Sequence, residues 1–86
     1  MDIDAIDLSQ LTAALRERTP PGEPIGYLRG KSTMRDIVRE YLGCSELEAE
    51  EIIDTLEARG YLQFHGDPHE RAQAFATWDI NPAAEA

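Results

Sequence analysis

The sequence lacks the features that mark secreted and membrane-spanning proteins. Its 86 residues include a single cysteine, Cys44, which excludes an intrachain disulfide framework and fits a reducing interior. It has no run of about 18 apolar residues, so we expect no transmembrane helix. Acidic residues follow Met1 where a signal peptide would have a basic stretch and an apolar segment. We therefore expect a cytoplasmic protein.

Positive charge is also scarce. Eight Lys and Arg stand against 17 Asp and Glu, which gives a formal net charge of −9. Such a chain repels polyanions at long range, which disfavours nonspecific binding to nucleic acids and to anionic membrane surfaces. An acidic surface can instead be an adaptation to a salt-rich cytoplasm, where molar salt shortens the screening length to about 3 Å. Both interpretations of the charge stay open.

The length allows one small domain. We expect it to span residues 7–80, with flexible tails at 1–6 and 81–86, because the ends hold too little apolar surface to fold. Asp7 and Gln10 predict the N-terminal cap of a first helix, and Pro20 and Pro21 must end it. The core stripe of that helix is Leu8, Leu11, Ala14 and Leu15.

Two further amphipathic helices are predicted on either side of a short turn at Gly43 and Cys44. The first of them runs from about Thr33 to Leu42, with a core stripe at Met34, Ile37, Val38, Tyr41 and Leu42. Ser45 and Glu48 form a capping box that opens the next helix, and Gly60 fits a left-handed cap at its end. The core stripe of this helix is Ala49, Ile52, Ile53 and Leu56. Two such stripes facing each other across a short turn form a helix-turn-helix.

A β-hairpin is predicted after these helices. The sequence Gly66-Asp67-Pro68 is a turn signal between strands at 61–65 and 71–80. Alternation in the second strand places Trp78 and Ile80 in the core and points Phe75 outward. We also expect a small strand ahead of the second helix, at Ile25, Tyr27 and Leu28.

This order of elements resembles the winged helix-turn-helix superfamily over about three quarters of the chain. The segment Leu56-Glu-Ala-Arg-Gly-Tyr-Leu62 is similar to the end of the recognition helix in many bacterial regulators. The resemblance implies an α+β, mostly helical fold of three helices with a C-terminal two-stranded β-hairpin, the wing. In many such proteins the last helix enters the major groove of DNA.

The third helix argues against that use. Its exposed face lacks Lys, Arg, Asn and Gln, and its carboxylates would be repelled by phosphates. We expect a non-enzymatic module that binds a protein with a basic surface, in a regulatory or transcription-related role. A surface that only keeps the domain in solution is the plainer alternative. The predicted partner-binding residues are Leu47, Glu50, Glu51, Asp54, Glu57 and, on the wing, Phe75.

A DNA-binding regulator that uses other residues is the alternative function. Basic side chains gather before and within the second helix, at Arg29, Lys31, Arg35 and Arg39. Together with the wing, they form a surface suited to phosphate. Pairing within the helix competes with this interpretation, because Arg35 lies close to Asp36 and Glu40, and Arg39 lies three residues from Asp36.

The sequence predicts no catalytic or metal centre. His65 and His69 bracket the wing turn, but a structural zinc site needs four ligands, and Cys44 lies in a different turn. A domain of this size should hold no deep pocket. We therefore expect no enzymatic activity and no cofactor. We also expect a monomer, because the first helix is too short for the long helical dimer contacts of many regulators.

Overall fold

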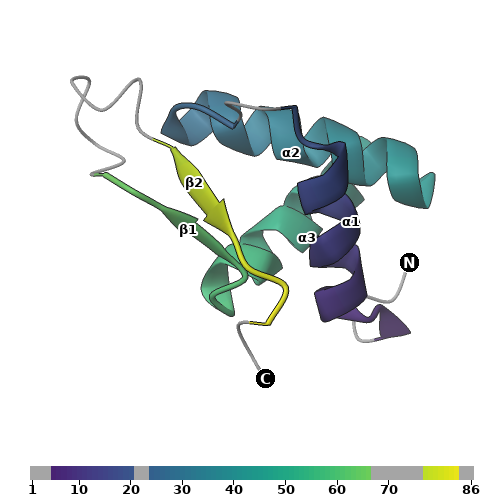
Figure 1. Ribbon diagram of the computed structural model, residues 1–86. Coiled ribbons are helices and arrows are strands. Elements are labelled where there is room, and N and C mark those ends of the chain that lie inside the picture. The colour runs from purple at the N-terminus through teal and green to yellow at the C-terminus, as the bar shows by residue number, and fades with distance from the viewer. Residues whose placement is uncertain (1–4, 21–23, 67–76, 84–86) are drawn as a thin grey trace.

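The computed structural model describes residues 5–20, 24–66 and 77–83. The elements follow in the order α1 (Leu8–Arg18), α2 (Tyr27–Leu42), α3 (Glu46–Ala58), β1 (Leu62–Phe64) and β2 (Trp78–Ile80). Helix α2 packs on α3, α1 packs on α2 and β2, and β1 packs on α3 (Figure 1). The prediction of a mostly helical α+β fold with three helices and a two-stranded antiparallel sheet is confirmed. None of the helices in these ranges is long and apolar enough to cross a membrane.

The predicted helix caps are confirmed. The Asp7 carboxylate accepts a hydrogen bond from the Gln10 N–H at 3.1 Å and opens α1. Ser45 and Glu48 exchange the two hydrogen bonds of a capping box at the start of α3, each 3.1 Å long. Gly60 follows α3 with a φ of 85°, which is the left-handed cap expected there.

The core forms where the three helices and the hairpin meet. The predicted stripes of α1 and α3 are buried, and in α2 the stripe residues Met34 and Val38 are at most 1% exposed. Tyr41 was predicted in this core, but it is 45% exposed. The guanidinium of Arg18 lies over the Tyr41 ring, with Cζ 4.5 Å from the ring centroid. The ring therefore packs against a side chain of α1 and not into the core.

Helix α2 starts earlier than predicted, at Tyr27 instead of about Thr33. The small strand expected at 25–28 is therefore wrong for Tyr27 and Leu28, which are helical. Only Ile25 pairs in a β-like manner, through an isolated antiparallel bridge to Thr77. Gly26 separates the bridge from the helix with a φ of 77°, a conformation that favours glycine.

Trp78 fixes the beginning of α2. Its Nε1 donates a hydrogen bond to the Gly26 carbonyl oxygen at 2.8 Å, and its ring stacks on that of Tyr27 with centroids 5.5 Å apart. A Cβ atom at Gly30 would lie 2.9 Å from Cδ1 of the same indole, so only glycine fits there. The contact explains why α2 begins where it does.

The hairpin pairs β1 with β2 in antiparallel register, with Phe64 opposite Trp78 and Leu62 opposite Ile80. Trp78 is buried and Ile80 packs against the core, as predicted. The predicted turn residues Asp67 and Pro68, and the outward-facing Phe75, lie outside the described residues.

Candidate functional site

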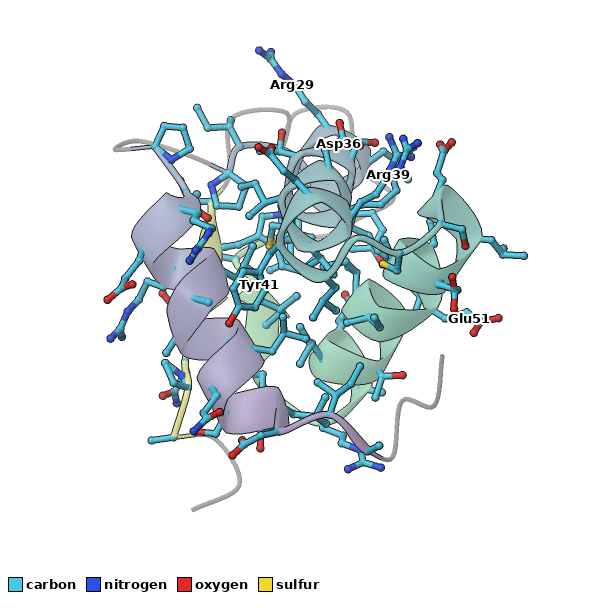
Figure 2. The ribbon with its side chains drawn as sticks, turned by 90° about the vertical axis from the view of Figure 1, so that its right-hand side faces the viewer. Arg29, Asp36, Arg39, Tyr41 and Glu51 are labelled. Atoms are coloured by element: carbon cyan, nitrogen blue, oxygen red, sulfur yellow. The ribbon has the colours of Figure 1, made fainter. Side chains whose placement is uncertain are left out.

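The outward face of α3 carries an exposed apolar side chain and a row of carboxylates. Leu47 is 66% exposed, and Glu50, Glu51 and Asp54 are exposed three, four and seven residues further along. This spacing places them on one side of the helix, because the opposite side is held in the core by Ile52 and its buried neighbours. Figure 2 shows Glu51 pointing away from the body of the molecule. Four of the predicted partner-binding residues therefore share one accessible face.

Glu57 belongs to a different environment, although it lies on the same helix. It is half-buried against α2, where the Tyr27 hydroxyl lies 3.4 and 3.3 Å from its two carboxylate oxygens. Its Oε1 also lies 3.4 Å from Nζ of Lys31. Phe75, the remaining predicted contact residue, lies outside the described residues.

Lys31 joins α2 to the C-terminal half of α3. Its Nζ lies 2.6 Å from Oδ1 of Asp54 and 5.3 Å from the centroid of the Tyr27 ring. Burial of the ammonium group lowers its pKa, but the hydrogen bond to Asp54 and the charges of Glu57 and Asp54 outweigh that effect. The pKa of Lys31 is raised as a result, so the lysine is held in its charged form.

Arg35 joins α2 to the N-terminal half of α3. It donates to Asp36 Oδ1 through Nη2 and Nε at 3.0 and 3.1 Å, which confirms that predicted local pair. Its Nη1 lies 3.2 Å from Glu46 and 3.4 Å from Glu50. The hydrogen bond to Asp36 is the main reason that the pKa of Arg35 is raised. No pair with Glu40 occurs within the described part of the chain.

The predicted basic patch is therefore divided. Lys31 and Arg35 are engaged by carboxylates, whereas Arg29 and Arg39 are exposed and make no ion pair among residues 5–20, 24–66 and 77–83. The expected pair between Arg39 and Asp36 is absent in those ranges. Arg29 extends from α2 into solvent in Figure 2. Two of the four basic side chains are thus exposed and unpaired within the part of the chain that the structure describes.

A groove of about 440 Å³ runs between α2 and α3. Ile53, which is 1% exposed, lies at its base, and Leu28, which is 76% exposed, forms part of one wall. The groove was not anticipated from the sequence, because Leu28 was expected in a strand. Its charged border consists of Lys31, Arg35, Glu50 and Asp54.

The histidine and cysteine side chains assemble no metal centre in the described ranges, where no three potential ligands come together. His65 Nε2 lies 2.8 Å from Oδ2 of Asp79 on the exposed side of the hairpin. Cys44 is half-buried and packs against the core. His69, the other histidine of the predicted wing turn, lies outside the described residues.

No protein-family model, curated protein or solved structure matches this chain.

Proposed function

We propose that this chain is a non-enzymatic winged helix-turn-helix module that binds a protein partner through a basic surface of that partner, in a regulatory or transcription-related role. The winged-helix assignment is supported by the order of three helices and a hairpin. The bridge between Ile25 and Thr77 supports it further, because many winged helices pair the segment before the second helix with the wing.

The outward face of α3 is the observation that carries the proposal. Leu47 offers an exposed apolar contact, and Glu50, Glu51 and Asp54 add negative charge along the helix beyond it. An apolar centre supplies affinity when it is buried in a complex, and the surrounding charges direct the approach of a partner of opposite charge. A basic protein surface satisfies both requirements.

The charges that α2 contributes do not cancel this acidity. Lys31 and Arg35 face five carboxylates, so the cluster between the helices keeps a net negative charge. Glu51 adds a further exposed carboxylate that has no ion pair within the described residues. The surface therefore attracts cations even where its carboxylates are already paired.

A DNA-binding regulator is the second candidate, and two exposed arginines favour it. Arg29 and Arg39 are accessible to phosphate, and the resemblance to winged-helix regulators points in the same direction. Lys31 and Arg35 oppose it, because binding to phosphate would require them to leave the carboxylates of α3. Protein binding is the better supported of the two.

Capture of the partner from a cell lysate by the immobilised protein tests the proposal. The double variant Glu51→Lys with Asp54→Lys should lose any protein that the wild type retains, because it reverses the charge of the outward face. The control is Glu17→Lys with Glu40→Lys, which makes the same change in net charge at exposed positions of α1 and α2. A partner that stays bound to the α3 variant would show the proposal to be wrong.

A further inference from the structure

We propose that the groove between α2 and α3 receives an arginine side chain of the protein partner, and that Lys31 competes with this arginine for Asp54. The inference rests on the proposed function, because it names the side chain that the basic partner presents.

The groove has an apolar part that suits the stem of a long basic side chain. Ile53 lies at the base, and Leu28 is largely exposed beside it, with no covering residue among those that the structure describes. The methylene groups of arginine bury well on such surfaces while the charged end remains among polar groups. The volume of about 440 Å³ is larger than that of one such side chain.

The border of the groove has carboxylate oxygens that are still free to accept hydrogen bonds. Asp54 uses Oδ1 to bind Lys31, and Glu50 uses Oε1 to bind Arg35. Their other oxygens, Oδ2 of Asp54 and Oε2 of Glu50, have no hydrogen-bond partner in the described ranges. These two residues lie four apart on α3, so both carboxylates are on the same side of the helix.

Arginine fits this arrangement better than lysine does. Its planar guanidinium presents several N–H groups in a fixed fork, which can donate to two carboxylates at once, and it is more weakly hydrated than an ammonium group. A lysine of the partner would only place a second compact ammonium group beside that of Lys31. The geometry therefore selects for arginine among basic side chains.

Lys31 has the opposite effect on the two kinds of ligand considered for this protein. It binds Asp54 at 2.6 Å and adds positive charge beside the groove, so it opposes the entry of an arginine. Its removal should strengthen the binding of an arginine-containing peptide, whereas removal of a phosphate-binding lysine would weaken the binding of DNA. The direction of the change separates the two interpretations.

The test is a titration of the ¹⁵N-labelled protein with acetyl-Arg-Leu-Arg-amide, followed by NMR at about 50 mM salt, where charge contacts are strong. Acetyl-Lys-Leu-Lys-amide, with the same charge, is the control peptide. We expect saturable shifts at the amides of Leu28 and Ile53, and an affinity about 2–5-fold higher for the arginine peptide.

The decisive comparison is between Lys31→Met and Arg39→Met. Each removes one positive charge from α2, but only Lys31 borders the groove. Lys31→Met should bind the arginine peptide about 2–5-fold more tightly than Arg39→Met does, as expected for the loss of one competing ion pair. Equal affinities, or no saturable binding of the peptide to the wild type, would overturn the inference. The proposed function would then still be tested separately, by the capture experiment with the α3 charge reversals.

Discussion

Trp78 and Gly26 lie 52 residues apart in the chain, and the indole Nε1 of the first donates to the carbonyl oxygen of the second at 2.8 Å. The contact ties the hairpin to the beginning of α2, and it also requires Gly30 to have no side chain. Because α2 carries Lys31 and Leu28 just beyond this point, the same contact sets the position of one wall of the groove. The same tryptophan therefore contributes both to the stability of the fold and to the shape of the groove.

Replacement of Gly30 by alanine should destabilise the protein by about 1–3 kcal/mol. The added methyl group would overlap the indole of Trp78, and overpacking of this kind costs about 1–3 kcal/mol, while loss of the indole hydrogen bond adds about 1 kcal/mol and better helix propensity returns about 1 kcal/mol. Urea unfolding measures the change, with the fluorescence of Trp78, the only tryptophan in the chain, as the signal.

Gly43→Asn is the matched control for this prediction. Gly43 has a φ of +67°, but no atom lies within 4 Å of a Cβ built there, and asparagine tolerates this conformation. Its cost should be about 1 kcal/mol or less. If the two variants prove equally stable, the close contact between Gly30 and Trp78 does not exist in solution.

Ser45→Ala should destabilise the protein by about 1 kcal/mol, because Ser45 Oγ accepts the hydrogen bond from the Glu48 N–H that opens α3. Thr55→Ala is the control in the same helix. Among the residues that the structure describes, the Thr55 hydroxyl donates to the carbonyl oxygen of Glu51 alone, so its loss should be offset by the helix propensity of alanine. Thermal unfolding monitored by circular dichroism compares the two. A Thr55→Ala variant less stable than Ser45→Ala would contradict the role of the cap.

Lys31 should make stability depend on alkaline pH. Its pKa is raised above the ordinary value of 10.5 on folding, so its contribution is fully present below that value and is lost as pH rises through the folded pKa. Lys31→Met should be less stable than the wild type by about 0.5–1 kcal/mol near neutral pH, as for other accessible ion pairs. Urea unfolding of both proteins should give a difference in stability that shrinks as the pH rises above 10.5. A difference that does not change with pH would mean that the charge of Lys31 makes no contribution.

The parts of the fold that local chemistry determines were predictable from the sequence. A cap such as that formed by Asp7 and Gln10 joins groups three residues apart, and a buried stripe follows from the period of one helix. The beginning of α2 was not predictable, because it depends on Trp78, far along the chain. Tyr41 was misplaced for a similar reason, since Arg18 of another helix covers its ring.

The candidate site divides in the same way. The period of α3 alone indicated that Leu47, Glu50, Glu51 and Asp54 share one face. The pairing of Lys31 with Asp54 and of Arg35 with Glu50 spans 23 and 15 residues and depends on how α2 crosses α3. The sequence pattern of one helix does not show how that helix crosses another. The division of the basic patch and the groove beside it could therefore be seen only in the structure.

That division predicts how the protein responds to DNA. We expect no binding of labelled random duplex DNA at about 50 mM salt, where electrostatic attraction is strongest. Only Arg29 and Arg39 are free among the four predicted basic residues in the described ranges, and α3 presents carboxylates where a recognition helix presents donors. Fluorescence anisotropy measures the binding.

If the wild type does not bind DNA, a variant of α3 can show whether its carboxylates are the reason. Glu50→Gln with Asp54→Gln removes two carboxylates that hold Arg35 and Lys31, so it should bind DNA more tightly than the wild type and lose that binding steeply with salt. A gain larger than that of Glu17→Gln with Glu40→Gln, which changes the net charge equally at exposed positions of α1 and α2, would show that the carboxylates of α3 keep the basic residues of α2 from phosphate. Micromolar binding by the wild type itself would instead favour a DNA-binding regulator, with Arg29 and Arg39 as the first positions to replace.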